Sequence, residues 1–159
     1  VFLTLIIMSK IALFPGSFDP FTKGHESIVN QSLRIFDEII IGIGVNTEKK
    51  YLFDLDKRIQ HIQEIFKSQN RVSVSSYHGL TIHYCETVSA SHIIRGLRNN
   101  IDFEYEKSIA HMNNSMSKIQ TILLLTNEEL SSISSSIIRE IHKNGGDISS
   151  FVTQAKILV

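Results

Sequence analysis

The segment Pro15-Gly-Ser-Phe-Asp-Pro-Phe-Thr-Lys-Gly-His25 holds both prolines of the chain and follows a short apolar run. A helix that begins near Gly24 would direct its free N–H groups and the positive end of its dipole at this loop, which suits a phosphate group. His25 falls in the first turn of that helix, where a cation is disfavoured. We therefore expect a neutral imidazole that donates one hydrogen bond to a phosphate oxygen. The alternative is a turn-forming histidine without a ligand.

A second polar cluster, Ile94-Arg-Gly-Leu-Arg98, has two arginines that flank a Gly-Leu pair. Guanidinium groups match the oxygens of phosphates in a bidentate way, so the pair suits a polyanion. Taken alone, it could also be a solvated charge pair. Asp102, Glu104 and Glu106 follow closely, and any of them could pair with an arginine or with a sugar hydroxyl.

A third cluster is the serine-rich run 131–136 (SSISSS), which precedes an amphipathic segment. These serines could simply cap a helix, or they could offer hydroxyls and N–H groups to further phosphates. Lys49, Lys50 and Arg139 add cations nearby in the sequence, although each could equally be an exposed surface charge.

The elements that would position these clusters alternate between short apolar runs and helical periodicity. The runs predict five buried strands, and the segments between them, with apolar residues three or four apart, predict helices. This order indicates an α/β protein with a Rossmann-like five-stranded parallel sheet and helices on both faces. Ligands of such sheets bind beyond the carboxyl ends of the strands, where the three clusters fall. The predicted strands are 11–14, 38–45, 71–76, 92–95 and 120–125.

Length and composition limit the remaining possibilities. The chain has 159 residues, 42% of them hydrophobic, which predicts one domain from Met8 to Val159, with Val1 to Ile7 as an upstream extension. A membrane anchor is the alternative for that extension, but its apolar run is shorter than a bilayer span. The 16 basic and 16 acidic residues balance, so neither nucleic acid nor a membrane surface is an expected partner. One cysteine, Cys85, excludes an internal disulfide and is expected in the core, and we expect a cytoplasmic protein.

Taken together, the motifs resemble the nucleotidyltransferase superfamily of the Thr/His-x-Gly-His type, and closely the bacterial phosphopantetheine adenylyltransferase family. The resemblance extends from about residue 10 to residue 152. It departs from the family pattern at Leu130 and Ser132, where aromatic residues are usual. The motifs that carry it are Pro15-Gly-Ser-Phe-Asp-Pro20 with Thr22-Lys-Gly-His25, Ile94-Arg-Gly-Leu-Arg98, Asp102-Phe-Glu-Tyr-Glu106 and Ile133-Ser-Ser-Ser136.

The resemblance implies transfer of AMP from ATP to 4′-phosphopantetheine, which gives dephospho-coenzyme A and pyrophosphate. It implies that His25 stabilises the transition state, that Mg²⁺ accompanies ATP without a protein side chain as ligand, and that the chain forms a homohexamer. Coenzyme A could act as an inhibitor. Phosphopantetheine would contact Ser17, Lys49, Thr81 and Arg95. ATP would contact Ser17, Phe18, His25, Gly96, Leu97, Arg98, Glu106, Leu130, Ser131, Ser132, Ile133, Ser134, Ser135 and Ser136.

The chemistry of this transfer agrees with the residues present. A phosphomonoester is already anionic at neutral pH, so the reaction needs no general base, and none is evident. The protein must instead hold two polyanions in line and stabilise the charge that moves onto the leaving pyrophosphate. Two alternatives stay open from sequence: a nucleotidyltransferase of the same fold with another acceptor, such as a nicotinamide or glycerol phosphate, and a nucleotide sensor without catalysis.

Overall fold

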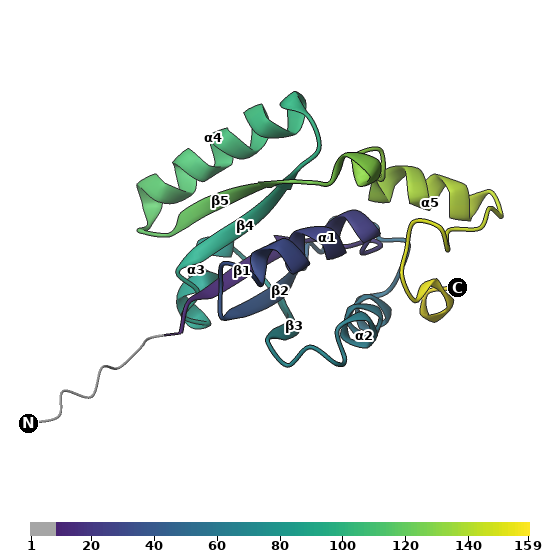
Figure 1. The fold of residues 1–159 in the computed structure, drawn as a ribbon, viewed down its shortest axis with the longest axis horizontal. Coiled ribbons are helices and arrows are strands. Elements are labelled where there is room, and N and C mark those ends of the chain that lie inside the picture. The colour runs from purple at the N-terminus through teal and green to yellow at the C-terminus, as the bar shows by residue number, and fades with distance from the viewer. Residues whose placement is uncertain (1–8) are drawn as a thin grey trace, which may run out of the picture.

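The computed structural model describes residues 9–159, and the expected extension lies outside this range (Figure 1). Strands and helices alternate along the chain, as the sequence predicts. Two short 3₁₀ helices, Glu128–Leu130 and Ala155–Ile157, lie in the C-terminal part. The strands are β1 Ile11–Gly16, β2 Glu38–Gly44, β3 Val72–Tyr77, β4 His92–Leu97 and β5 Gln120–Leu125. The helices are α1 Lys23–Ser32, α2 Leu55–Ile65, α3 Thr81–Thr87, α4 Asn100–Met116 and α5 Ser135–Lys143.

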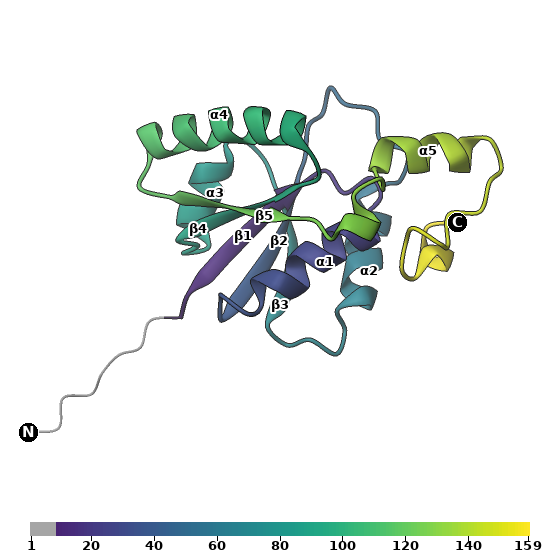
Figure 2. The same cartoon turned by 45° about the horizontal axis from the view of Figure 1, so that its top comes forward.

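The strands form one parallel sheet in the order β3-β2-β1-β4-β5. Helices α1 and α2 cover one face of the sheet, and α3 and α4 lie on the other (Figure 2). This arrangement confirms the predicted Rossmann-like fold. Each buried strand is a continuous apolar run because both of its faces are covered.

The order in which strands are added to the sheet changes side at the central strand β1. Strands β2 and β3 lie on one side of β1, and β4 and β5 lie on the other. Strands β1 and β2 pair along their whole length. In contrast, β1 pairs with β4 only at Ala12 opposite His92 and at Leu13 opposite Ile93. Beyond Leu13 the two strands are no longer paired. The fold therefore opens a crevice between their carboxyl ends, the position where open α/β sheets bind ligands.

The core explains why these helices form where they do. Ile28 and Val29 of α1 and Ile62 of α2 are buried against the first face of the sheet. On the other face, Ile82 and Cys85 of α3 are buried, so Cys85 is a core residue as expected. The sequence favours Asp54 as a helix cap, and Asp54 stands at the N-cap of α2, but its side chain makes no capping hydrogen bond.

Helix α4 and the C-terminal segment differ in how far they bury their apolar side chains. The spacing of Tyr105, Ile109, Met112 and Met116 predicts one face of a helix, and in α4 this face is largely at the surface, with Tyr105 65% and Met112 64% exposed. The C-terminal segment 148–158 packs on α2 and α5 through buried apolar side chains. No helix within residues 9–159 has the length and hydrophobicity needed to cross a membrane.

Candidate active site

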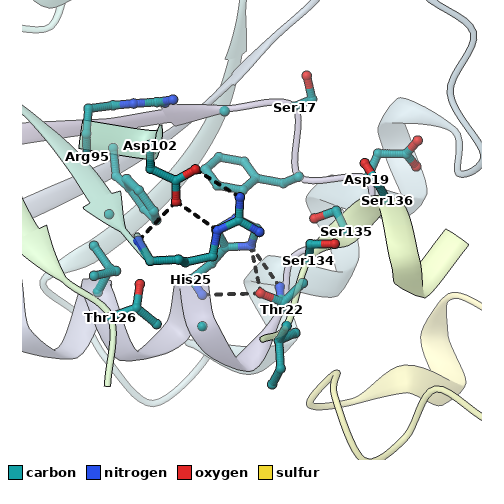
Figure 3. A pocket seen from close by; sticks show the side chains of 18 of the residues that line it. Ser17, Asp19, Thr22, His25, Arg95, Asp102, Thr126, Ser134, Ser135 and Ser136 are labelled. Carbon is teal, nitrogen blue, oxygen red and sulfur yellow. Dashed lines mark hydrogen bonds and ion pairs between the residues drawn. The ribbon is translucent and has the colours of Figure 1, made fainter. Parts of the chain in front are cut away.

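A cavity of about 340 Å³ lies at the carboxyl ends of β1 and β4 (Figure 3). Its walls come from the loop after β1, the first turn of α1, the end of β4 with the start of α4, and the start of α5. Segments more than a hundred residues apart in the chain thus meet at one place. Of the residues predicted to bind substrates, those lining it are Ser17, Phe18, His25, Lys49, Arg95, Gly96, Arg98, Glu106, Ile133, Ser134, Ser135 and Ser136.

A second cavity of about 460 Å³ adjoins the first on the side of α3 and α4. Thr81, the remaining residue predicted to contact phosphopantetheine, lines this second cavity. Side chains of α4, including Tyr105 and Asn113, line it as well. The two cavities therefore form one two-compartment site with a common wall. The residues in that wall are Pro15, Gly16, Ser17, Lys49, Arg95 and Glu106.

His25 is held in one orientation by the start of α1. The side chain of the N-cap residue Thr22 accepts from the backbone N–H of His25, while the backbone N–H of Thr22 donates to His25 Nδ1 at 3.0 Å. This reciprocal pair is a capping box. Because Nδ1 accepts, a neutral ring carries its proton on Nε2, and Nε2–H is left as a donor. The ring packs against Phe14, Phe18 and Phe21.

The surroundings of His25 keep its ring neutral. Burial, together with the charges of Arg95 and Arg98, lowers the pKa of His25 from 6.5 to about 3, and burial is the largest of these causes. The imidazole and the two guanidinium groups are therefore close enough to interact, as the sequence-based hypothesis requires. The expected neutral donor is consistent with this environment.

Both arginines of the second cluster are paired with carboxylates of α4. Arg95 donates from Nε and Nη2 to the buried Glu106 at 2.7 and 2.5 Å, and from Nη1 to the carbonyl of Pro15 at 2.6 Å. This last bond spans the gap where β1 and β4 separate. Arg98 donates from Nε and Nη2 to Asp102 at 3.0 and 3.2 Å (Figure 3). Burial raises the pKa of Asp102, but hydrogen bonds from Arg98 and its charge outweigh burial and hold that pKa below its usual value.

The start of α5 gives the cavity a second helix N-terminus. Ser134 is the N-cap residue, and its hydroxyl accepts from the N–H of Ile137 at 3.2 Å. Arg139, one turn further, donates to the carbonyl of Asp19 at 2.8 Å and to the hydroxyl of Ser136 at 3.1 Å. Two helix dipoles thus point their positive ends into one cavity, which favours an anionic ligand.

Side-chain charge in the cavity is closer to balance than the sequence suggests. Asp19 is buried and ties the loop after β1 to the loop after β2, because its carboxylate accepts from the N–H groups of Leu52 and Phe53 at 2.8 and 2.9 Å. Lys49 instead reaches the hydroxyl of Ser17 at 3.3 Å. The cations that line the cavity are Lys49, Arg95, Arg98 and Arg139, and the carboxylates are Asp19, Asp102 and Glu106.

Four residues predicted to bind ATP do not line either compartment. Leu97, the last residue of β4, is buried, and Leu130 lines a separate surface groove beside α1. Ser131 and Ser132 precede the part of the serine run that reaches the cavity. For these four, ATP binding stays a prediction.

The cavity also holds residues that were not among the predicted ligands. Asp19 and Thr22 lie within the first motif, so their position was available from the sequence. Asp102 follows Arg98 by four residues, which is a spacing that allows an ion pair. From the sequence alone, Arg139 is also consistent with an exposed surface charge. Its position in the cavity depends on how α5 packs, which the sequence does not reveal. Thr126, which follows β5, also lines the cavity.

Comparison with known proteins agrees with the fold. A family model described as Cytidylyltransferase-like matches residues 13–141, and the chain belongs to this family of nucleotidyltransferases. A solved structure described as a putative nicotinate-nucleotide adenylyltransferase from Vibrio parahaemolyticus has the same fold, with a TM-score of 0.68 at 22% identity over 95% of this chain and 92% of that one.

Relatives with higher identity narrow the family. Proteins named phosphopantetheine adenylyltransferase match from Flavobacterium psychrophilum (57% identical, 91% of this chain and 95% of the relative) and Flavobacterium johnsoniae (52%, 91% and 95%). The protein of that name from Cytophaga hutchinsonii is 49% identical, over 91% of this chain and 97% of the relative. The chain is a member of the phosphopantetheine adenylyltransferase family.

Proposed function

We propose that this chain transfers AMP from ATP to 4′-phosphopantetheine and releases dephospho-coenzyme A and pyrophosphate, the penultimate step of coenzyme A biosynthesis. One observation carries the assignment within this structure: two cavities share a wall that contains Ser17, Lys49 and Arg95. A transfer between two substrates needs two binding compartments whose reactive ends meet, and a nucleotide sensor would need only one of them.

In the proposed reaction, an oxygen of the phosphopantetheine phosphate attacks the α-phosphorus of ATP in line with the bond to the β-phosphate. That bond breaks, and pyrophosphate leaves with the electron pair, so no covalent intermediate with the protein forms. The attacking phosphate is ionised at neutral pH, since its second pKa is about 6. The protein therefore acts by placing the two phosphates together and by stabilising charge.

Each structural feature of the first cavity suits the nucleotide. The Nε2–H of His25 can donate to the phosphate oxygens that gain charge as pyrophosphate leaves. The N-termini of α1 and α5 and the guanidinium of Arg98 surround the same space. In the common wall, Lys49 and Arg95 can contact the acceptor phosphate where it meets the α-phosphorus of ATP.

We expect Mg²⁺ to enter with ATP. The described residues contain no group of three or more His, Cys, Asp or Glu side chains that could hold a metal ion. Magnesium on a nucleotide is held mainly by phosphate oxygens and water, with few protein ligands, so the cavity fits the ion as part of its substrate. When bound, it would neutralise part of the phosphate charge.

We also expect the chain to assemble as a homohexamer in the cytoplasm. The exposed apolar side chains of α4 and of the edge strand β5 support an interface between copies, because single chains rarely leave such a face uncovered. Light scattering on the purified protein measures the mass of the assembly. Coenzyme A, which carries both a pantetheine arm and an adenylate, would compete for the two compartments.

Incubation of the protein with ATP, Mg²⁺ and 4′-phosphopantetheine, followed by mass detection of the nucleotide product, tests the proposal. Dephospho-coenzyme A and an equal amount of pyrophosphate are expected. Parallel reactions with nicotinamide mononucleotide and with glycerol phosphate identify another acceptor, if there is one. Binding of ATP without turnover of any acceptor would contradict the proposal and favour a sensor.

A further inference from the structure

Arg58, in the first turn of α2, is the one residue with a permanent charge among the largest fully buried side chains of residues 9–159, with 2% of its surface exposed. No carboxylate of these residues lies within ion-pair distance of its guanidinium. Burial lowers the pKa of Arg58, and the charges of Asp19, Tyr51 and Asp54 oppose that effect. Placing a guanidinium in such a position is costly unless its donors are satisfied, so its contacts indicate what it is for.

Those contacts reach both loops that form the common wall of the two cavities. Nη1 of Arg58 donates to the carbonyl of Ser17, in the loop after β1, at 2.6 Å. Nε donates to the carbonyl of Phe53, in the loop after β2, at 3.0 Å. The guanidinium also lies over the ring of Tyr51, 4.2 Å from its centroid. Arg58 itself lines neither cavity.

The same two loops carry the polar groups on the cavity side. Lys49 donates to the hydroxyl of Ser17, and its ammonium lies 5.7 Å from the centroid of the Tyr51 ring. Arg58 therefore contacts the backbone of one member of the Ser17–Lys49 pair and the aromatic ring beside the other. It is placed behind the pair, where it can fix the distance between them.

A purely structural role would be to join the two loops, but Asp19 already does so through the N–H groups of Leu52 and Phe53. Arg58 adds a hydrogen bond to the carbonyl of Ser17, the residue of the common wall whose hydroxyl accepts from Lys49. Loss of Arg58 should therefore leave the loops joined and change the position of Ser17 relative to Lys49.

We propose that Arg58 is a positioning residue for the acceptor phosphate: through the Ser17 carbonyl and the Tyr51 ring, it holds the Ser17–Lys49 pair in the wall between the two compartments. This inference rests on the proposed function. It does not depend on contact between Arg58 and either substrate.

The variant Arg58→Lys tests the proposal, because lysine keeps the charge but lacks the fork that reaches two carbonyl groups at once. We expect the KM for phosphopantetheine to rise roughly tenfold, as a small displacement of a binding group would cause. The Kd for ATP, measured by calorimetry, should rise less than this KM, because Ser17 is the one predicted ATP contact to which Arg58 is hydrogen-bonded, whereas His25, Arg98 and α5 do not contact Arg58. An unchanged KM for phosphopantetheine would overturn the proposal.

Arg71→Lys is the matched control. Arg71 also donates from Nη1 to a distant backbone carbonyl, that of Leu33 at 3.0 Å, but it is exposed and lies at the amino end of the edge strand β3, whereas the site lies at the carboxyl ends of β1 and β4. This variant should lose some thermal stability and keep both kinetic constants. Equal kinetic losses in the two variants would show that Arg58→Lys acts only through stability.

A double-mutant cycle with Lys49→Ala gives a readout that stability alone does not move. If Arg58 acts through Lys49, the double variant should lose little more activity than Lys49→Ala does, whereas additive losses would contradict the mechanism.

A second variant, Tyr51→Leu, tests the proposal if Arg58→Lys fails to fold. It removes the ring from a half-buried position and should raise the KM for phosphopantetheine, and a wild-type KM in this variant overturns the proposal. Inactive wild-type protein would refute the proposed function instead.

Discussion

Replacing His25 separates two roles that the structure gives to one side chain. Its Nδ1 completes the capping box of α1 with Thr22, and its Nε2–H is the free donor in the cavity. Glutamate is a residue that natural capping boxes use at this position, so His25→Glu can keep the bond from the N–H of Thr22, and its ionised carboxylate has no hydrogen to donate. His25→Ala loses both the bond and the donor.

The two roles have different expected magnitudes. Loss of one preorganised donor to the transition state reduces kcat by about 10²- to 10³-fold, which corresponds to about 3–4 kcal/mol. Loss of the capping bond reduces the free energy of unfolding by about 1 kcal/mol. We expect both variants to lose kcat to this extent, and only the alanine variant to lose the capping energy as well.

Pyrophosphate release under saturating substrates measures kcat, and denaturant unfolding measures stability. If His25→Glu retains more than about a tenth of the wild-type kcat, the donor role is refuted, because a missing donor should lower kcat at least tenfold further than that. A kcat that falls in step with stability across both variants would likewise refute it.

Four other changes test the geometry of the site and of the core. Arg95→Ala should chiefly raise the KM for phosphopantetheine, and unchanged kinetics with that substrate would remove it from the acceptor site. Gly24→Ala should fold normally, because the added Cβ would meet no protein atom closer than 3.4 Å. It should nevertheless raise the KM for ATP about tenfold, because the Cβ fills space at the first turn of α1. In Gly96→Ala the Cβ would lie 2.9 Å from Ile28, so this variant should instead lower the melting temperature. Burial lowers the pKa of His61, so the folded state favours the neutral ring. The contribution of this group to stability is therefore full above pH 6.5 and falls below it, by at most about 1.4 kcal/mol per pH unit. In unfolding curves recorded from pH 6.5 to 5, His61→Phe should reduce that slope, and an unaltered slope would contradict the assignment.

The sheet and its order of elements could be predicted because both faces of every central strand are covered. Runs such as 38–45 are then apolar throughout, and the polar clusters fall at their carboxyl ends. The separation of β1 from β4 after Leu13 could not be predicted, because it depends on strand pairing between segments about eighty residues apart. The crevice that holds the site is a consequence of that separation.

The site was predicted best where several residues of one motif lie on one turn, as from Thr22 to His25. It was predicted least well where a side chain acts from another element. Arg58 is an example: it sits on the inward side of α2 near Ile62, and a charged residue on an apolar helix face was the available signal. Which carbonyl groups it reaches depends on the loops packed above it, and these come from distant parts of the chain.

The pairing of Arg95 with Glu106 and of Arg98 with Asp102 has a consequence for selectivity among the many anions that a cell contains. A small ion such as inorganic phosphate must compete with a carboxylate already in place at each guanidinium, and it gains little by doing so. A molecule long enough to engage both helix ends and several donors together gains from each of them. The acidic residues therefore discriminate by size: they discourage occupancy by simple salts and leave the cleft open to extended, multiply charged metabolites.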